Sequence, residues 1–556
     1  MSDSLISSHE DLINSVYSRL QSHFPNNQYD NLRVMVDGCF ADSSMRDLEK
    51  YEVQDLVGMV LTLWRSIQER TNENAQVSVV NPNVEEHEWQ SQHTIVSVLH
   101  AEVPFIIDTA RLYLNASGMN IHSIFHHTFN VERDAKGAFK NFGKKGKPEL
   151  LLCLEIDRTS NSKQRARIRD EIAAILKDVM VVVDDFPLMS AKTKEVVSAL
   201  SAKGIPFEKD VLDEAKVFMQ WLESNHFTFL AYDEYEIKDG KIKTIDGSEL
   251  GLFKNQDRRD EKAINEMADD HRDHVFEKKL LVFTKSGKRS TVHRSAYSDY
   301  VLVKRYDEKG NVVGGRRFMG LYTSSVYNQT PQDIPVVRQK IAQVLSESGF
   351  DKGSHRYKEL CGILYNFPRD ELIQSDPDTL LTTCKGVLSI NERKQIRLFL
   401  RKDPYSNFLS ALVYMPREIF NTQVRVKVHD MLTEYFDAEG SDFTTFFSES
   451  VLARTRFVFK LAKPLDELPP IDVLENRIVQ LARRWSDELQ YALSETYGEE
   501  QGIRLFRHYE DAFAPSYTEH YSARVAVADI GRIEALHANE TDNLSLSFFR
   551  NVEPNS

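Results

Sequence analysis

Cysteine is scarce in this chain of 556 residues and never occurs in a close pair. The four thiols stand far apart in the sequence, at Cys39, Cys153, Cys361 and Cys384. A disulfide framework or a zinc site needs closely and regularly spaced cysteines, so this spacing argues against both. Sparse cysteine is typical of a reducing compartment, where each thiol behaves as a small buried apolar group.

Targeting and membrane-spanning segments are also missing. Residues 1–10 contain no basic stretch followed by an apolar run, so no signal peptide is evident. Nowhere does an uncharged apolar run reach the length needed to cross a bilayer. These absences predict a cytoplasmic protein.

Positive charge is in deficit. The chain has 70 Lys and Arg against 84 Asp and Glu, a formal net charge of -14, which argues against nucleic acid as a general partner because phosphate binding needs a basic surface. Apolar residues at 41% and charged residues at 28% are ordinary for a globular protein. A chain of this length is expected to divide into several domains.

The glycine-rich turn of dinucleotide-binding proteins does not occur, because the chain contains no GxGxxG. The nearest glycine cluster, Gly310–Gly315, leads into a predicted strand and has the wrong context. Gly287–Ser290 (Gly-Lys-Arg-Ser) resembles the end of a phosphate-binding loop, but Val282 stands where the leading glycine belongs. A solvated turn is the favoured interpretation there.

Strands and helices alternate in the first third of the chain. Apolar residues at helical spacing between Val53 and Leu61 predict a helical N-terminal segment. The following block reads as strand, helix, strand, strand, helix, with the elements at 94–99, 104–118, 121–131, 150–156 and 168–179. This order begins a ferredoxin-like unit, the split βαβ arrangement.

Later segments predict a hairpin, a second similar unit and a final module. Asp239-Gly240 between alternating runs is a strong hairpin signal. Residues 393–465 read as two strands, a helix and two strands, which is not the standard ferredoxin-like order. Ala523–Ala528 and Leu544–Phe549 read as strands of a module inside which the chain is expected to stop.

The sequence therefore predicts an α+β multidomain protein, with ferredoxin-like modules joined by helical segments and a mixed β-rich domain. The expected parts are a helical segment at 1–75, a first ferredoxin-like domain at 76–204, a mixed domain with hairpins at 205–332, a helical connector at 333–392, a second ferredoxin-like domain at 393–465, and at 466–556 a helical connector with the start of a truncated third module.

Several residue clusters have a functional and a structural interpretation. His122, His126 and His127 lie on one predicted strand, but no cysteine or carboxylate at ligand spacing completes a metal site, so half-exposed strand histidines are favoured. No metal site and no catalytic residue is therefore predicted.

Two further clusters also have both a functional and a structural interpretation. Ser324, Ser325 and Tyr327 lack the Gly-x-Ser-x-Gly elbow of a nucleophile, so hydroxyls capping a turn are favoured. Asp184 and Asp185 could form an acid and base pair, but a solvated helix end is the preferred interpretation.

Several stretches carry a resemblance to one family. The stretches are Arg317–Pro335, His226–Ile237 with Asp246–Phe253, Trp89–Val96 with Val103–Asp108, Arg397–Pro404 with Val413–Arg417, Arg484–Leu489 and Tyr509–Tyr517. Together they resemble the N-terminal region of the large bacterial NAD-specific glutamate dehydrogenases. The resemblance implies that the two ferredoxin-like modules are ACT-type domains, which commonly bind amino acids and pair with one another. It also implies that a Rossmann-type NAD domain and a substrate lysine lie further along in full family members.

This resemblance leads to one functional prediction and one alternative. The chain is expected to be the regulatory and oligomer-forming portion of such an enzyme, with no cofactor of its own although the whole enzyme uses NAD. The alternative is a stand-alone amino-acid-sensing or scaffold protein. In ACT-type domains the ligand commonly sits by the loop between the first strand and the first helix, so Glu102, Val103 and Pro104 are the candidate effector-binding loop. The expected partners are an amino-acid effector and further copies of the chain, with neither nucleic acid nor membrane.

Overall fold

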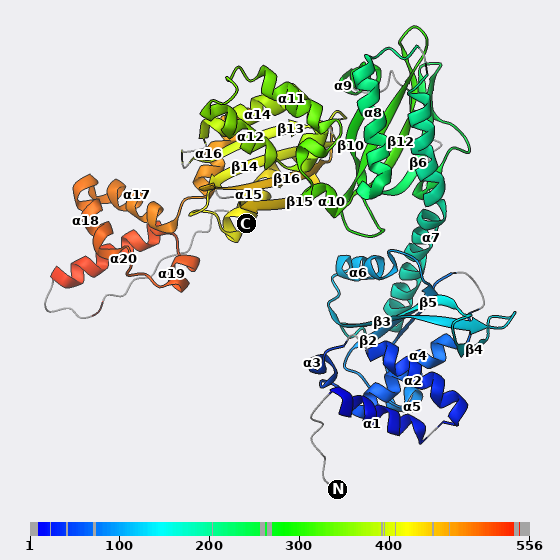
Figure 1. Cartoon of the computed structure of the whole chain (residues 1–556). Coiled ribbons are helices and arrows are strands. Elements are labelled where there is room, and N and C mark those ends of the chain that lie inside the picture. Colours follow the sequence, from blue (N-terminus) through cyan, green and yellow to red (C-terminus); the bar gives the residue numbers. More distant parts are fainter. Residues whose placement is uncertain are drawn as a thin grey trace. The chain divides into compact units, whose positions relative to one another are not determined.

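The computed structural model describes residues 9–22, 24–40, 43–70, 74–202, 204–255, 262–263, 269–390, 393, 395–405, 407–447, 450–465, 467–538 and 544. The chain divides into two compact units, residues 1–343 with 368–374 and residues 344–367 with 375–556. Both units combine helices with antiparallel sheets (Figure 1), which confirms the α+β class predicted from the sequence.

Helices form the N-terminal part of the first unit. They are α1 (His9–Gln21), α2 (Asn26–Phe40), α3 (Met45–Leu48) and α4 (Val53–Ile67). The buried residues of α4 include Leu56, Val60 and Leu63, which recur at i, i+4 and i+7 and therefore share one helical face. That face lies in one core with Leu12 and Val16 of α1. The helical interpretation of this segment is confirmed.

The first sheet has the strand order β1-β2-β5-β3-β4, and all its neighbours are antiparallel. Its strands are β1 (Gln76–Val80), β2 (Thr94–Ala101), β3 (Ile121–Arg133), β4 (Phe139–Phe142) and β5 (Lys147–Ile156). The other elements around it are α5 (Val84–His87), α6 (Ile106–Ala116) and α7 (Ser162–Ala199).

Helices cover both faces of the first sheet. Val96 and Leu152 face the core shared with α6 and α7, whereas Ile95 and Leu151 face the core shared with α1, α2 and α4. A strand buried on both faces reads as a continuous apolar run, which explains why residues 149–156 of β5 are buried without alternation.

The split βαβ prediction is confirmed in its elements, since β2, α6, β3, β5 and α7 follow in that order. The sequence did not predict β1, which precedes β2 in the chain and pairs with it at the sheet edge. Gly118 has a φ of 71°, the left-handed conformation that ends α6 and turns the chain toward β3.

The middle sheet belongs to the same unit and has the order β10-β11-β12-β6-β7-β9, with β8 paired to β6. Its strands are β6 (Phe227–Lys238), β7 (Lys241–Thr244), β8 (Leu250–Gly251), β9 (Lys262–Ala263), β10 (Leu281–Arg289), β11 (Tyr297–Tyr306) and β12 (Val312–Tyr322). Asp239 and Gly240 join β6 to β7 with φ values of 51° and 70°, as a two-residue hairpin turn of this type requires. The hairpin prediction is confirmed.

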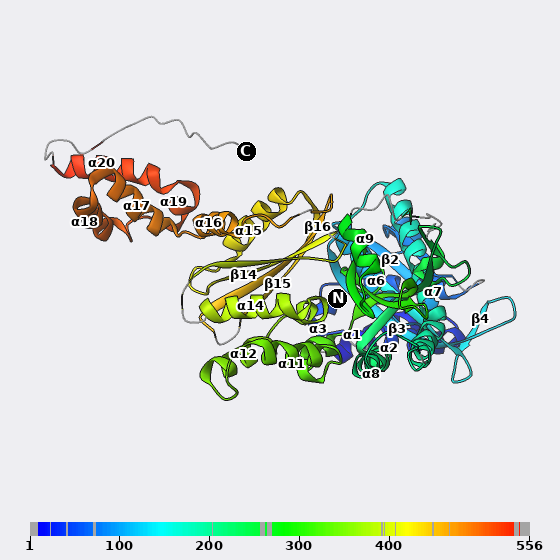
Figure 2. The same cartoon turned by 90° about the horizontal axis from the view of Figure 1, so that it is seen from above.

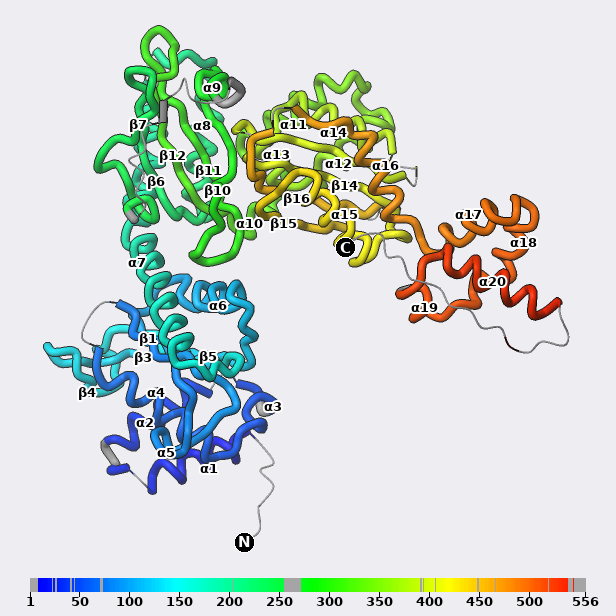
Figure 3. Tube along the Cα trace, turned by 180° about the vertical axis from the view of Figure 1, so that it is seen from behind, coloured from blue at the N-terminus to red at the C-terminus, as the bar shows by residue number. Residues whose placement is uncertain are grey.

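Helices and short turns complete the first unit. They are α8 (Lys209–Trp221), a π-helical turn at Leu222–His226, a 3-10 turn at Leu252–Asn255, α9 (Asp269–Phe276), α10 (Ser324–Asn328), a 3-10 turn at Pro331–Asp333 and α13 (Arg369–Gln374), while α11 (Val337–Glu347) begins in this unit. In the tube view of Figure 3, α7 extends from the first sheet to α8 and the middle sheet. Its buried residues from Ile168 to Val182 lie in one core with residues of both the first and the middle sheet, and its Asp185 accepts a hydrogen bond from Gly251 of the middle sheet.

The second sheet, in the second unit, has the order β13-β14-β16-β15 and is also antiparallel. The elements around it are α12 (His355–Tyr365), α14 (Pro377–Ile390), β13 (Arg397–Lys402), β14 (Phe408–Pro416), α15 (Thr422–Tyr435), β15 (Ala438–Phe447), β16 (Leu452–Leu461) and α16 (Ile471–Leu481). Figure 2 shows α12 and α14 on one side of this sheet and α15 and α16 on the other.

Packing on the two faces of the second sheet follows the strand alternation. Leu409, Ala411 and Val413 lie in a core with α15 and α16. On the other face α14 approaches closely at Gly386, where an added Cβ would lie 2.5 Å from the Phe399 ring. The order of two strands, helix and two strands predicted for residues 393–465 is confirmed.

The last helices of the second unit have their own small core. They are α17 (Trp485–Tyr497), α18 (Glu499–Tyr509), α19 (Pro515–His520) and α20 (Ala523–Ala538). The strand predicted at Ala523–Ala528 is wrong, because this segment begins α20. Ala523, Ala526, Val527 and Ile530 bury one helical face at i, i+3, i+4 and i+7, and that periodicity prevails over the local alternation.

The predicted third module is therefore also wrong for residues 467–538, whose regular elements are helices. The strand predicted at Leu544–Phe549 lies outside the described residues except for Leu544.

The solvated helix end predicted at Asp184 and Asp185 is wrong as well. Both residues lie inside α7, and Asp185 is 5% exposed. Its carboxylate accepts hydrogen bonds from Gly251 N and Lys254 Nζ, each at 2.7 Å. A buried carboxylate needs such partners, so Asp185 ties α7 to the middle sheet.

Among the helices that the structure describes, none has both the length and the apolar character required to cross a bilayer.

Candidate functional site

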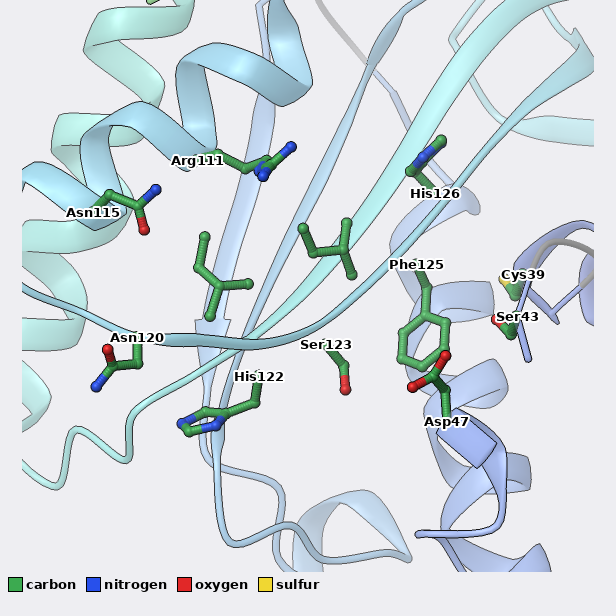
Figure 4. A pocket seen from close by; sticks show the side chains of 12 residues that line it. Cys39, Ser43, Asp47, Arg111, Asn115, Asn120, His122, Ser123, Phe125 and His126 are labelled. Carbon is green, nitrogen blue, oxygen red and sulfur yellow. The ribbon is translucent and has the colours of Figure 1, made fainter. Parts of the chain in front are cut away.

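A cavity of about 620 Å³ lies along β3 of the first sheet, and we call it the β3 pocket. Its lining comes from three places in the chain: the α2–α3 region, the second half of α6, and the start of β3 (Figure 4). The lining residues are Cys39, Ser43, Asp47, Arg111, Asn115, Asn120, Ile121, His122, Ser123, Ile124, Phe125 and His126. The volume is within the range of small-molecule sites.

The fold leaves this stretch of β3 accessible. β4 pairs only with residues 131–133 of β3, so in the described part of the chain the upstream residues pair with β5 alone. The register of β3 on β5 shifts between Ile121 and Ser123. An irregular strand at a sheet edge is a common place to re-aim side chains, and here the shift falls inside the pocket lining.

Helix α6 supplies the cationic side of the pocket. Its buried residues Ile106, Ala110 and Leu114 pack on the first sheet at i, i+4 and i+8. Arg111 and Asn115 each follow one of these positions and are exposed, one turn apart, so they share a polar face beside β3. Figure 4 shows both side chains on the same side of the cavity. Among the described residues, Arg111 makes no ion pair.

The opposite side of the pocket is acidic and hydroxyl-bearing. Ser43 and Asp47 come from the segment after α2, and Figure 4 shows Asp47 across the cavity from Arg111. The Ser44 hydroxyl donates to Asp47 Oδ2 at 2.7 Å, and Lys50 Nζ donates to Oδ1 at 3.4 Å. The hydrogen bond from Ser44 and the nearby Lys50 lower the pKa of Asp47 from its usual value. Asp47 therefore carries its charge at neutral pH.

A polar network fixes the base of the pocket. Asp157 accepts from Asn120 N at 3.0 Å and from Asn120 Nδ2 at 2.9 Å, and it lies 2.8 Å from His122 Nε2. The backbone hydrogen bond of Asn120, followed by the contact with His122, lowers the pKa of Asp157. The His122 ring stacks on His93 with centroids 4.2 Å apart. His122 is therefore held in place as a lining residue.

Behind this network lies a buried carboxylate. Glu155 is 1% exposed, and its Oε2 accepts from Tyr51 OH at 2.5 Å and lies 3.5 Å from His93 Nδ1. Its Oε1 is buried without a hydrogen-bond partner in the described structure. Burial and the hydrogen bond to Glu155 raise the pKa of Tyr51. Tyr51 OH also lies 3.0 Å from Ser123 Oγ, which joins the buried carboxylate to the pocket wall.

This arrangement suits a zwitterion. A guanidinium binds a carboxylate through parallel hydrogen bonds, and a carboxylate such as Asp47 binds an ammonium group. The amides and hydroxyls between them provide donors and acceptors for the remaining polar atoms of a ligand. The β3 pocket can therefore hold a small molecule that carries one anionic and one cationic group.

The predicted effector loop lies elsewhere on the same domain. Glu102, Val103 and Pro104 precede the N-terminus of α6, whereas the pocket begins in its second half. Glu102 N donates to Pro148 O at 3.0 Å, and Thr128 Oγ1 donates to Glu102 Oε2 at 2.6 Å. No finding tests ligand binding by this loop, so it stays a prediction.

Other residues singled out in the sequence have structural surroundings. His122 and His126 line the β3 pocket, and the described residues contain no group of three or more His, Cys, Asp or Glu suited to a metal ion. Ser324 and Ser325 begin α10, and Ser325 Oγ lies 2.7 Å from Thr323 Oγ1. Tyr327 OH donates to Asp370 at 3.2 Å. These contacts agree with the interpretation of a hydroxyl-rich turn.

Sequence reasoning missed most of this pocket. Arg111, Asn115 and Asp47 come from segments that only the tertiary fold brings together. The available signal was the pair Arg111 and Asn115 at i, i+4 on the polar face of an amphipathic helix, directly before a strand.

Comparisons with known proteins identify the class. Four models describing parts of glutamate dehydrogenase match the chain: the ACT1 domain at residues 35–172, helical motif 1 at 334–393, the ACT2 domain at 397–486 and helical motif 2 at 492–536. The two ACT-domain matches fall on the first and second sheets. The fold and the site thus belong to a multidomain α+β protein of the glutamate dehydrogenase class.

Curated relatives narrow the class to a family. NAD-specific glutamate dehydrogenase of Halomonas elongata is 37% identical over 98% of this chain and 34% of that relative. The enzyme of the same name from Pseudomonas aeruginosa is 36% identical over 97% of this chain and 34% of its own length. That from Mycobacterium tuberculosis is 26% identical over 78% of this chain and 27% of its length. The chain belongs to the NAD-specific glutamate dehydrogenase family, and it spans about a third of the length of the relatives from Halomonas elongata and Pseudomonas aeruginosa.

These matches overturn the prediction of a truncated regulatory portion and its alternative of a stand-alone sensor. The relative from Halomonas elongata aligns along 98% of this chain, so the similarity to the named enzyme extends along nearly all of it. Where the chain begins or ends carries no conclusion about the rest of the protein. The prediction that no cofactor belongs to this chain is also wrong on this finding, because the aligned relatives are named for NAD.

The described residues do not themselves fit a doubly wound dinucleotide fold, which needs parallel strands and a glycine-rich turn into a helix. Every pair within their three sheets is antiparallel. Gly310 precedes β12, whereas Gly314 and Gly315 lie within it, and a Cβ at Gly314 would lie 2.2 Å from the Tyr235 carbonyl oxygen. These glycines allow close strand pairing, and no residue is assigned to NAD.

Proposed function

We propose that the protein of this chain acts in the NAD-dependent oxidation of L-glutamate. In this reaction glutamate, NAD and water give 2-oxoglutarate, ammonium, NADH and a proton. The observation that carries the proposal is the alignment of 98% of the chain, at 37% identity, with a relative named NAD-specific glutamate dehydrogenase. The four matching glutamate dehydrogenase models support it independently.

The role proposed for the first sheet and its helices is that of an ACT-type domain that binds an amino-acid effector. The β3 pocket supports this role, because Arg111 offers a partner for a carboxylate and Asp47 a partner for an ammonium group. The buried network of Glu155, Tyr51 and Ser123 stiffens the wall against which the ligand packs. Binding energy at this pocket is thus available to favour one conformation of the domain over another.

Association of several copies through ACT-type domains is the second part of the proposal, and a cytoplasmic location the third. Exposed phenylalanines on β15, Phe443 and Phe447 at 49% each, support association because such rings are rarely left open to water in a group. Free thiols, with Cys39, Cys153 and Cys384 buried, support a reducing compartment.

The activity is tested on the protein as its cells make it. The protein is purified with an antibody to residues 1–556, and NADH formation is followed with L-glutamate and either NAD or NADP. Glutamate-dependent reduction of NAD, with little reduction of NADP, is the expected result. Purified protein that reduces neither cofactor, while a known glutamate dehydrogenase is active in the same assay, overturns the proposed function.

The effector role is tested by amino-acid titration of the same protein and of two variants. Arg111→Ala is expected to weaken the binding of the active amino acid about tenfold or more, since a charge-assisted hydrogen bond is worth about 1.5–3 kcal/mol. Arg169→Ala is the matched control, because Arg169 is exposed on α7 beside Asp170 and lies outside the pocket. Equal binding by all three proteins contradicts the assignment of the effector to the β3 pocket.

A further inference from the structure

A second cavity, of about 480 Å³, lies between the middle sheet and α7, and we call it the β10 pocket. It is lined by the segment that was interpreted as a solvated turn, Gly287-Lys-Arg-Ser290, and by residues packed around it. The lining residues are Asp178, Leu252, Ser286, Gly287, Lys288, Arg289, Ser290, Thr291, Ser298, Tyr300 and Met319. The volume is large enough for a small organic ligand.

A bulge in the hairpin of β10 and β11 shapes this pocket. Lys285 pairs with Asp299 and Arg289 pairs with Tyr297, so residues 286–288 of β10 stand opposite Ser298 alone on β11. The extra residues leave the ladder, and all three of them line the cavity. A bulge of this kind re-aims side chains and is frequent beside binding sites.

Hydroxyl groups gather at the bulge. Ser286, Ser290 and Ser298 are only 6%, 7% and 1% exposed, although serine is mostly found at protein surfaces. Ser286 Oγ accepts from Lys288 N at 3.4 Å, and Ser290 Oγ donates to Val292 O at 2.7 Å. These bonds hold the hydroxyls in fixed positions around the cavity, where Thr291 adds another.

Two cationic side chains also line the β10 pocket. Lys288 and Arg289 are both exposed and both line the pocket. Arg289 lies over the Tyr297 ring at 4.6 Å, which limits the directions its guanidinium can take. Lys288 forms no ion pair within the described part of the chain, so its ammonium group is available to an anion.

The remaining walls are apolar or acidic. Leu252 and Met319 are 8% and 4% exposed and form an apolar surface beside the hydroxyl cluster. Asp178, on α7, adds one carboxylate to the lining. A bare anion is attracted by the two cations and repelled by the Asp178 carboxylate. A ligand that also has an apolar part and a hydroxyl group can in addition contact the apolar residues and donate a hydrogen bond to Asp178.

We propose that the β10 pocket binds a small organic phosphate through its phosphate group. Phosphate offers acceptor oxygens in several directions, and the lining offers the charged groups of Lys288 and Arg289 and hydroxyl groups such as that of Ser286 as donors. A planar carboxylate uses fewer of them. The apolar surface of Leu252 and Met319 receives the organic part, and Asp178 accepts from a hydroxyl of the ligand. This site is distinct from the β3 pocket and does not depend on the proposed function.

The test measures the binding of inorganic phosphate and of glycerol phosphate to the purified protein by calorimetry, at constant ionic strength. Both are expected to bind, with glycerol phosphate the tighter of the two. Lys288→Ala is expected to weaken inorganic phosphate about tenfold or more, because a hydrogen bond to a charged group is worth about 1.5–3 kcal/mol. Asp178→Asn is expected to strengthen inorganic phosphate severalfold by removing a like charge.

Controls separate the site from general surface charge and from loss of the fold. Lys309→Ala removes an exposed lysine from the turn between β11 and β12, outside the pocket, and is expected to leave binding unchanged. Far-ultraviolet circular dichroism of each variant checks the fold. The proposal is overturned if phosphate does not bind, if glutarate binds as tightly as glycerol phosphate, or if Lys288→Ala and Lys309→Ala have equal effects. The opposite signs expected for Lys288→Ala and Asp178→Asn cannot arise from simple destabilisation.

Discussion

Apart from the additional strand β4, the first and second sheets share a strand order, but their edges are covered differently. In each, an edge strand comes first in the chain and pairs with the next strand, β1 with β2 and β13 with β14. In the second sheet a helix and two more strands follow, whereas in the first sheet a helix and three strands follow, of which β4 lies at the edge beyond β3. In both sheets the strand that comes last in the chain lies in the interior. Apart from β4, β2 therefore corresponds to β14, β3 to β15 and β5 to β16.

The corresponding strands β3 and β15 show the difference most clearly. Phe125 and Phe129 of β3 are 4% and 3% exposed, beneath α2 and the neighbouring helices. Phe443 and Phe447 of β15 are 49% exposed. Guanidinium groups lie over these open rings, Arg425 over Phe443 at 3.9 Å and Arg417 over Phe447 at 5.4 Å. One strand order can therefore carry either a closed or an open aromatic edge, according to what the chain places beside it.

The turns after the second strand differ as well. In the first sheet Glu102 is hydrogen-bonded by Thr128, and Phe105 packs against the His293 ring at 4.9 Å. In the second sheet the corresponding turn contributes Arg417 to a cavity of about 840 Å³ that Tyr414 and Arg454 also line. A common fold thus leaves its open pockets at different ends of the two domains.

Removing a buried phenylalanine from β3 is expected to have the largest effect on the free energy of unfolding. Phe129→Ala leaves a cavity between β3 and α2, and a cost of about 3–5 kcal/mol in the free energy of unfolding is expected. Urea unfolding read by hydrogen exchange in peptides of β5 measures it. A cost below about 1 kcal/mol contradicts the closed edge.

Two glycines sharpen the contrast between tight and open packing. A Cβ on Gly38 of α2 would lie 2.6 Å from the Phe129 ring, whereas one on Gly362 of α12 meets nothing within 4 Å. Gly38→Ala is expected to destabilise the first unit by about 1–3 kcal/mol. Gly362→Ala is expected to stabilise the second unit by about 0.5–1 kcal/mol, because alanine favours the helix. The same urea experiment compares them, and equal signs contradict the packing described.

The pKa values of two buried tyrosines, one in each domain, can be compared. Burial and the hydrogen bond to Glu155 raise the pKa of Tyr51 in the first domain. Burial raises the pKa of Tyr414 in the second sheet to about 12, while Arg454 opposes that rise. Glu155→Gln is therefore expected to lower the pKa of Tyr51, and Arg454→Gln to raise that of Tyr414. Absorbance titration of phenolate in each variant, compared with the unchanged protein, reads both shifts.

The sign of the stability change follows from these shifts. A tyrosine whose pKa is higher in the folded state keeps its proton when the unfolded chain loses it. Its contribution is present below the unfolded pKa of about 10 and is lost as pH rises through the folded pKa. For Tyr414 the loss is expected between about pH 10 and 12. Shifts of the same sign in Glu155→Gln and Arg454→Gln contradict the two environments.

A substitution of an exposed phenylalanine on β15 is expected to have the smallest effect on the free energy of unfolding. Phe447→Ala removes a ring that is already half exposed, so a change within about 0.5 kcal/mol is expected. Sedimentation of the same variant reads self-association, which is expected to weaken. A loss of stability above about 2 kcal/mol shows that β15 is covered in the protein and breaks the contrast with β3.

Local signals in the sequence predicted much of the fold. Gly118 ends α6, Asp239-Gly240 forms a hairpin, and the predicted order of strands and helix at residues 393–465 is the order found. Such signals depend on near neighbours in the chain. The strand β1 escaped prediction because its polar, half-buried sequence becomes a strand by pairing with β2.

Tertiary contacts decided the rest. The alternation at Ala523–Ala528 suggested a strand, but the longer helical face that packs against α17 prevailed. Asp185 gave no sign of burial because its partners, Gly251 and Lys254, lie far away in the sequence. The β3 pocket was missed for the same reason, since only the folded chain brings Asp47 and Arg111 to opposite sides of one cavity.

The helix α7 has a mechanical consequence. It has 38 residues, which at a rise of about 1.5 Å per residue makes a rod of roughly 57 Å. Its residues from Ile168 to Val182 lie in a core that the first and middle sheets share, and Asp185 attaches the helix further to the middle sheet. A tilt of about 5° at one end of a rod of that length moves the other end by roughly 5 Å. Pro187 removes one backbone hydrogen-bond donor close to Asp185, so α7 is expected to bend most easily near its attachment to the middle sheet.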